Sequence, residues 1–175
     1  MESAKILVIG EKGVGKTEFT KSISWYPPTN IFKKFGGVGY LKIINGRCKV
    51  KNSMIYIYCL DEPNDEALLR NILEGQRSKF DAILFMFDAS KVGAKEYLDE
   101  LKQHSLVIDE LCFGRVPYLM VANKIDLLTK PNLIRNLKFG LSSGQQIEPC
   151  NAMNKDNVAG VFYNLLQIIN NNTHE

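Results

Sequence analysis

Short, nearly continuous apolar runs alternate along the chain with stretches whose apolar residues recur at helical spacing. The runs predict strands at residues 5–9, 54–60, 82–87, 116–122 and 146–150. Tyr40–Ile44 and Cys48–Val50 predict a hairpin that turns at the favoured pair Asn45-Gly46. Helices are expected from Lys16 to about Ser24, across most of 61–79, and over 95–111 and 156–170. Residues 25–39 predict a loop, because they hold several prolines and glycines, and 127–141 is ambiguous, with Pro131 as a helix start.

The alternation of strands with helices predicts an α/β fold with a mostly parallel sheet and helices on both faces. Near-continuous apolar strands fit such a sheet, because its strands are buried on both sides. A chain of 175 residues suits one domain, which is expected to span 1–175. Ligands of these sheets bind where the strands end. The residues that follow each strand are therefore the first candidates for a site.

Composition and charge narrow the function classes. Lys and Arg number 22 against 19 Asp and Glu, and no concentrated basic stripe is present, so nucleic acid is not expected as a ligand. Neither a secretory leader, an apolar run long enough for a membrane span, nor a lipidation motif is found, which predicts a cytoplasmic protein without a direct lipid anchor. The cysteines lack metal-site spacing, and two of them, Cys59 and Cys112, stand in apolar runs.

Residues 10–17 read Gly-Glu-Lys-Gly-Val-Gly-Lys-Thr and match G-x-x-x-x-G-K-[ST] between a predicted strand and a predicted helix. The backbone N–H groups of such a loop, and the helix that follows, bind phosphate oxygens. Lys16 is expected to reach the outer phosphates, and the Thr17 hydroxyl to bind Mg²⁺. Nucleotide contacts are expected from Gly10, Lys12, Gly13, Val14, Gly15, Lys16, Thr17 and Glu18.

A second motif, Asn123-Lys124-Ile125-Asp126, directly follows a later predicted strand. A carboxylate accepts two N–H bonds from the edge of guanine, and adenine does not offer that pair. A site built on such bonds discriminates strongly, because the wrong base leaves buried polar groups unpaired. Together with the phosphate loop, this motif predicts a guanine nucleotide as the ligand.

Over nearly its whole length the chain resembles the Ras-like small GTPases. The matching segments are GEKGVGKT at 10–17, Asp61 after a strand, FDAS at 87–90, NKID at 123–126 and Cys150-Asn151-Ala152-Met153. The resemblance implies a P-loop G domain with a six-stranded, mostly parallel sheet and helices on both faces. It also implies GTP or GDP as ligand and Mg²⁺ as cofactor.

The resemblance assigns roles around the base. Asn123 would position the base and its loop, Lys124 would cover one face of the ring, and Asp126 would read the guanine N1 and N2 groups. Asn151, Ala152 and Met153 would form the loop beside the base, with the Ala152 N–H on the guanine O6. Met153 replaces the usual Lys and either packs on the base or fills the core. Trp25 and Tyr26 are candidates for a ring stacked on the base, with core packing the favoured alternative.

The chain departs from the family around the γ-phosphate. Asp61-Glu62-Pro63-Asn64-Asp65 stands where the family has Asp-x-x-Gly-Gln. Asp61 is a candidate to hold Mg²⁺ through water, and Asp65, a candidate catalytic residue beside Lys16, replaces the Gln that orients water. Thr29, a candidate metal ligand, comes only 29 − 17 = 12 residues after Thr17. Lys12 either neutralises phosphate charge or points to solvent.

Two functions follow from the resemblance. The first is a guanine-nucleotide switch that hydrolyses GTP weakly or with a partner's help and takes part in signal transduction or intracellular transport. Its partners would be an exchange factor, an activating protein and effectors, or a larger complex. The alternative is a pseudo-GTPase scaffold that binds nucleotide without turnover, suggested by Asn64 and Asp65. An ATP-using P-loop enzyme, such as a small kinase, is disfavoured by residues 123–126.

Overall fold

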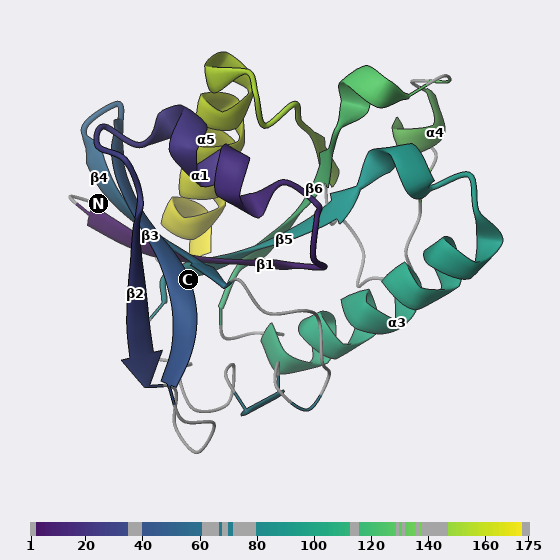
Figure 1. The fold of residues 1–175 in the computed structure, drawn as a ribbon, viewed down its shortest axis with the longest axis horizontal. Coiled ribbons are helices and arrows are strands. Elements are labelled where there is room, and N and C mark those ends of the chain that lie inside the picture. The colour runs from purple at the N-terminus through teal and green to yellow at the C-terminus, as the bar shows by residue number, and fades with distance from the viewer. Residues whose placement is uncertain are drawn as a thin grey trace.

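The protein is described here from a computed structural model, which covers residues 3–34, 40–60, 67, 70–71, 80–112, 116–128, 130, 132–135, 137 and 147–172. The described part contains one sheet of seven strands in the order β2-β3-β4-β1-β5-β6-β7 (Figure 1). The strands are β1 (Ser3–Gly10), β2 (Thr29–Lys34), β3 (Tyr40–Val50), β4 (Ser53–Leu60), β5 (Ala82–Asp88), β6 (Tyr118–Asn123) and β7 (Ile147–Pro149). The helices are α1 (Lys16–Ile23), α3 (Lys95–Cys112), α4 (Asn132–Arg135) and α5 (Lys155–Asn172), with short 3₁₀ turns η2 (Ala89–Lys91) and η3 (Ile125–Leu127).

The pairing of the strands confirms the predicted fold class. β1 lies in the middle and pairs in parallel with β4 and β5, and β5-β6 and β6-β7 are also parallel. Within the described sheet, only the β2-β3 and β3-β4 pairs are antiparallel. The carboxyl ends of β1, β5, β6 and β7 therefore meet along one edge of the sheet, which is where α/β folds bind their ligands.

The sheet has one strand more than the six expected, because Thr29–Lys34 form β2 within the segment predicted to be a loop. The two prolines at 27 and 28 precede the strand, so they do not interrupt its hydrogen bonds. β2 pairs with β3 from Thr29 opposite Asn45 to Lys34 opposite Tyr40. It forms the edge of the sheet beyond β3.

The predicted turn at Asn45-Gly46 is wrong, since both residues lie inside the continuous strand β3. The chain reverses instead at Lys51-Asn52, between Val50 and its partner Ser53. The position of Gly46 requires glycine because of close packing, not because the chain turns there. A Cβ built on it would lie 2.5 Å from Ser24 Oγ and 2.5 Å from Thr20 Cγ2, so a side chain would collide with α1 and the residue that follows it.

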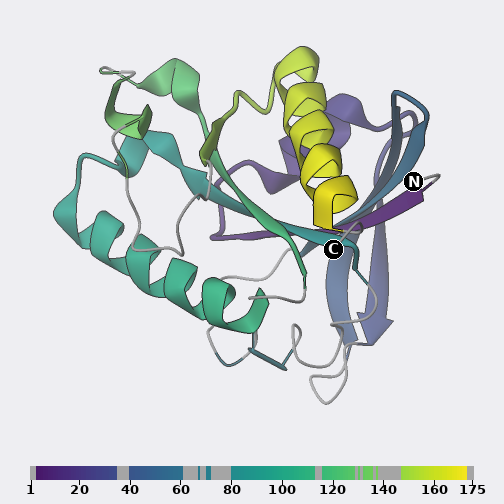
Figure 2. The same cartoon turned by 180° about the vertical axis from the view of Figure 1, so that it is seen from behind.

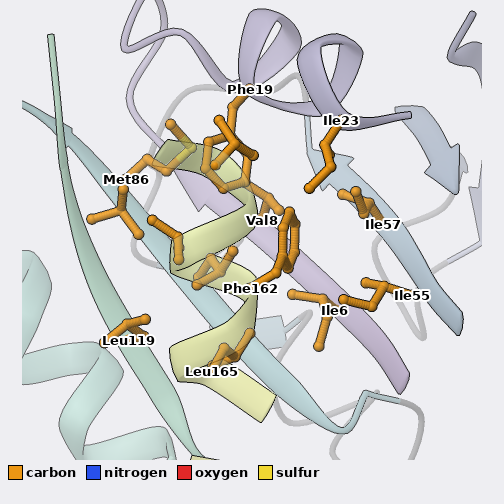
Figure 3. Packing of buried hydrophobic residues seen from close by; sticks show 14 of the residues in the cluster. Ile6, Val8, Phe19, Ile23, Ile55, Ile57, Met86, Leu119, Phe162 and Leu165 are labelled. Carbon is orange, nitrogen blue, oxygen red and sulfur yellow. The ribbon is translucent and has the colours of Figure 1, made fainter. Parts of the chain in front are cut away.

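Two apolar cores lie on opposite faces of the sheet, and β1 supplies alternate residues to each because strand side chains alternate. α1 and α5 cover one face and α3 covers the other, as the front and back views show (Figure 2). Under α1 and α5, Ile6 and Val8 pack with Phe19 and Phe162, whose ring centroids are 5.3 Å apart (Figure 3). Full burial of each such side chain contributes about 1.5–3 kcal/mol.

Several of the sequence-based predictions fall on residues outside the described ranges. They include Asp61, Asp65 and most of the helix expected over 61–79. The remaining predicted elements match the observed ones to within a few residues, and the ambiguous segment 127–141 contains the short helix α4. None of the helices in the part of the chain that the structure describes combines the length and the apolar character of a membrane span.

Candidate nucleotide-binding site

The phosphate-loop motif lies between the end of β1 and the start of α1, at the edge where the parallel strands end. Gly10 has a φ of 151°, and a Cβ there would lie 2.3 Å from the Met86 carbonyl oxygen. Only glycine therefore lets the loop leave β1 so close to β5. Lys12 and Gly13 are exposed at the outer part of the loop, and Val14 is fully buried beneath it.

Helix α1 opens toward this loop without a capping side chain. Its N-cap is Gly15, with a φ of 97°, and no side-chain hydrogen bond caps the helix. The first N–H groups of a helix have no partner within the helix, and together with the helix dipole they attract anions. Thr17 is half-buried in this first turn, while the exposed Glu18 carboxylate turns aside to Lys21 at 3.1 Å. The first turn thus suits a phosphate group.

The Lys16 side chain folds back over the loop and is only 5% exposed. Its Nζ donates hydrogen bonds to the carbonyl oxygens of Gly10, at 2.7 Å, and Glu11, at 2.9 Å. These bonds hold a positive charge inside the ring of backbone atoms. A buried ammonium group needs such partners, because burying an unpaired charge is costly.

Asn123 joins the phosphate loop to the segment that precedes α5. Its Nδ2 donates to the Val14 carbonyl at 2.7 Å, and its Oδ1 accepts from the Ala152 N–H at 2.8 Å. The side chain is 2% exposed and lies over Gly15, where a Cβ would come within 2.4 Å of Asn123 Nδ2. The two sequence motifs and the 150–153 segment therefore meet at one buried amide.

Lys124 has a φ of 64°, an unusual conformation for a residue with a side chain, and begins the turn η3. Its Nζ donates to Asp88 Oδ2 at 2.6 Å, and Asp88 Oδ1 accepts from the N–H and hydroxyl of Ser90 at 3.0 and 2.6 Å. Burial opposes ionisation of Asp88, but the bonds from Lys124 and Ser90 outweigh it and lower the pKa of the carboxyl. Asp88 therefore fixes the Lys124 side chain at the edge of the sheet.

The expected base loop is held to the end of β6. The Cys150 N–H donates to the Ala122 carbonyl at 2.8 Å, and the Ile125 N–H donates to the Cys150 carbonyl at 3.3 Å. Asn151 Oδ1 accepts from the Met153 N–H at 3.0 Å. The Met153 side chain is 75% exposed, so the interpretation of it as a core residue is wrong. Asp126 is also exposed, which leaves both side chains accessible to a ligand.

Other predicted residues lie elsewhere. Thr29 is exposed in β2 opposite Asn45, next to the Gly46 that packs on Thr20 and Ser24. Its role as a metal ligand stays a prediction. Trp25 and Tyr26, at 51% and 66% exposure, are not core residues. The Trp25 N–H bonds to Arg47 of β3.

Sequence reasoning missed two functional candidates, Glu11 and Tyr97. The Tyr97 hydroxyl, from the first turn of α3, donates a short hydrogen bond to Glu11 Oε1 and accepts from the Asp88 N–H at 2.8 Å. Burial and the bond to Glu11 raise the pKa of Tyr97 far above its usual value, so it stays protonated. In the sequence, Asp88 and Ser90 stand out only as part of a family-like segment, and nothing pairs residue 97 with residue 11.

The strand–loop–helix with its buried lysine, the mostly parallel sheet and the asparagine that joins two loops define a P-loop nucleotide-binding protein. A family model described as "Ras family" matches residues 5–171, and the chain belongs to this family. It is therefore a member of the P-loop GTPase superfamily. A search of curated protein sequences gives no match.

Solved structures with the same fold include the GTPase Era. One is a variant of Era from Aquifex aeolicus bound to GDP·AlF₄⁻, with a TM-score of 0.67, 21% identity and coverage of 95% of this chain. Another is Era in complex with MgGDPNP and nucleotides 1506–1542 of 16S ribosomal RNA, with a TM-score of 0.59, 20% identity and the same coverage. The chain spans 57% of the length of each of these Era chains. At this identity the likeness establishes the shared fold.

Proposed function

We propose that the protein is a guanine-nucleotide switch that binds GTP and GDP with Mg²⁺ and has low intrinsic hydrolysis. The observation that carries the proposal is the Asn123 amide, which ties the carbonyl of Val14 to the N–H of Ala152. One nucleotide would therefore meet the phosphate loop with its phosphates and the 150–153 loop with its base. The family membership supports guanine nucleotide as the ligand.

The phosphates would lie against residues 10–17 and the first turn of α1. Lys16 Nζ, already inside the loop, would exchange carbonyl partners for phosphate oxygens, and the first-turn N–H groups would supply the remaining donors. Mg²⁺ in nucleotide sites is held by one or two protein oxygens together with the phosphates. The Thr17 hydroxyl, half-buried in the first turn, would be one such oxygen and Asp61 another, through water. Bound Mg²⁺ would neutralise phosphate charge.

The base would lie against the exposed side of the second loop. The Asp126 carboxylate would accept the N–H groups of the guanine edge. The Ala152 N–H, which donates to Asn123 Oδ1, would hold the loop in place beside the base. Asn151 would hold this loop through its bond to the Met153 N–H. The aliphatic stem of Lys124 and the exposed Met153 would cover the two faces of the ring.

Weak hydrolysis is proposed from the sequence of the second switch. Asp65 replaces a glutamine, and an ionised carboxylate has no N–H with which to orient the attacking water and repels the γ-phosphate. Positioning and charge would then come from Lys16 and from an activating protein. The competing proposal, a scaffold that holds nucleotide without turnover, rests on the same substitutions at Asn64 and Asp65.

The first experiment identifies the bound nucleotide and its fate. The purified protein is denatured and the released nucleotide is identified by chromatography, before and after incubation with GTP and Mg²⁺. GTP that persists, with slow phosphate release above that of Thr17→Ala, supports the switch. Release no faster than that of Thr17→Ala, with and without an activating protein, favours the scaffold. Absence of any guanine nucleotide, before or after incubation, contradicts both.

Base specificity is tested separately with Asp126→Ala and the matched control Asp156→Ala, an exposed aspartate in the first turn of α5. The first variant is expected to lose most of its preference for GDP over ADP, and the control to keep it. Equal preference in both variants would show that another group reads the base.

Partners and location are proposed on the family and the sequence. We expect an exchange factor, an activating protein and effectors, in a cytoplasmic role in signalling or transport. Nucleic acid is not proposed as a main ligand, because the basic excess is small. An Era structure does contain ribosomal RNA. Titration with a labelled RNA at low and high salt tests the point, since phosphate contacts give strongly salt-dependent binding.

A further inference from the structure

Glu11 brings a negative charge into a loop built to bind anions. It is the second residue of the phosphate-loop motif, and its carbonyl accepts from Lys16 Nζ, the group expected on the phosphates. A carboxylate free to turn toward bound phosphates would repel them and would compete for the same donors. The direction in which this side chain is held therefore bears on nucleotide affinity.

The structure holds the Glu11 carboxylate on the side of α3. The Tyr97 hydroxyl donates to Glu11 Oε1, and Lys91 Nζ lies 3.6 Å from Oε2. Lys91 Nζ also lies 5.3 Å from the centre of the Tyr97 ring, within the range of a cation–π contact. The Glu11 side chain is 30% exposed, so solvent screens these charges only in part.

The Tyr97 hydroxyl is itself fixed in position. It accepts from the Asp88 N–H at 2.8 Å, and the Asp88 carboxylate in turn accepts from Lys124 Nζ at 2.6 Å. With its proton committed to Glu11 and a lone pair to Asp88, the hydroxyl has a single favourable orientation. The Tyr97 hydroxyl thus joins the phosphate loop to Asp88 at the end of β5. Asp88 in turn orients Lys124, the lysine expected beside the base.

We propose that Tyr97 is a positioning residue for nucleotide binding, whose hydroxyl holds the Glu11 carboxylate away from the phosphates. The proposal rests on the proposed nucleotide site at residues 10–17. Tyr97 does not contact the nucleotide itself. Its effect passes through Glu11, so removing the hydroxyl should matter only while residue 11 carries a negative charge.

The test is a double-mutant comparison of Tyr97→Phe, Glu11→Gln and the two combined, with the affinity and release rate of fluorescent GDP as the measurements. Tyr97→Phe keeps the ring and removes one hydrogen bond to a charged group, which predicts an affinity loss of about tenfold. In the Glu11→Gln background the same change is expected to cost less than about twofold. Glu11→Gln alone is expected to bind at least as tightly as the wild type.

The matched control is Tyr118→Phe. Tyr118 is a buried tyrosine whose hydroxyl also bonds to a carboxylate, Asp109 Oδ1 at 3.0 Å, but it lies at the opposite end of its strand from the site. It should leave affinity unchanged. Salt supplies a second readout, since charge repulsion is screened: the Tyr97→Phe loss should shrink between low and high salt, whereas a packing defect would not respond.

The outcomes separate the two proposals. Wild-type protein that does not bind GDP overturns the nucleotide site and the role of Tyr97 with it. Wild-type binding with equal affinities for Tyr97→Phe and Tyr118→Phe overturns only the role of Tyr97, and so does an equal loss in both Glu11 backgrounds. If Tyr97→Phe does not fold, Lys91→Gln is used instead, because it removes the ion pair with the Glu11 carboxylate. The loss of GDP affinity in Lys91→Gln must again disappear in the Glu11→Gln background.

Discussion

Lys124 Nζ lies 2.6 Å from Oδ2 of Asp88, a carboxylate that is 3% exposed, so one ion pair joins the last residue of β5 to the residue that follows β6. The contact places the charge of the lysine beside β5 and leaves its stem along the surface where the base is expected. It also makes Asp88 a structural group with a measurable pH dependence.

Asp88→Asn should destabilise the fold by about 1–3 kcal/mol at pH 7, because it removes a charge-assisted bond to Lys124. The pKa of Asp88 is lowered in the folded state, so its contribution is complete above the unfolded value of about 4 and is lost as pH falls below it. The stability gap between wild type and variant should therefore shrink toward pH 2–3. Urea unfolding over this pH range, with the exposed Asp99→Asn as control, measures it.

Asn123→Ala should lower both stability and nucleotide affinity. It leaves the Val14 carbonyl and the Ala152 N–H without their partner in a buried place, which costs about 2–4 kcal/mol. Chemical unfolding and fluorescent GDP binding measure the two effects, with Asn132→Ala on the exposed start of α4 as control. Unchanged affinity in a folded Asn123→Ala protein would separate the two loops functionally.

Gly46→Ala should destabilise the protein by about 1–3 kcal/mol, because the added methyl group collides with Thr20 and Ser24 at the end of α1. Gly160, in the middle of α5, has open space around its Cβ position. Gly160→Ala should therefore stabilise the helix by up to about 1 kcal/mol. Thermal unfolding of the pair distinguishes a glycine held by packing from one that is replaceable; shifts of the same sign would contradict this account.

The thiols should react slowly in the folded protein. Cys48, Cys59, Cys112 and Cys150 are all buried thiols, and none of the four forms a disulfide. Burial raises the pKa of Cys48 and of Cys150 to about 12, so neither is a thiolate near neutral pH. A thiol reagent at pH 8 is expected to label the native chain far more slowly than the urea-unfolded chain, in which four groups react.

The same burial gives a second, opposite pH dependence. Unfolded cysteines ionise above about pH 8.5 while the buried ones do not, so their contribution to stability is present below that value and lost as pH rises through it. Cys48→Ala should reduce this alkaline loss. An unchanged alkaline slope would assign it to other groups.

The sequence was sufficient for the fold because β1, β5 and β6 are buried on both faces and need continuous apolar runs. The phosphate loop could also be predicted from the sequence, since Gly10, Gly15 and Lys16 occupy positions that few residue types can fill. These features are local, because the residues that form the phosphate loop are close together in the sequence as well as in the structure.

Features that depend on distant contacts were not readable. Asn45-Gly46 has the composition of a turn, but the packing of α1 on β3 requires a glycine within the strand. Thr29–Lys34 became a strand because β3 extends far enough to pair with it. The bond between Tyr97 and Glu11 joins residues 86 positions apart. The sequence around a half-buried tyrosine on a helix does not indicate which distant residue its hydroxyl will bond.

Because strand β7 is short, the part of the site next to it is expected to open before the phosphate loop does. β7 has three residues and pairs only with β6 in the described sheet, whereas β1, which carries the phosphate loop, has a long partner on each side. Fraying begins where few hydrogen bonds must break, so amide protons at Cys150 and Ala152 should exchange with solvent long before those of Leu7 and Val8. When a bound nucleotide dissociates, its base would then lose its protein contacts first, while the phosphate loop still holds the phosphates.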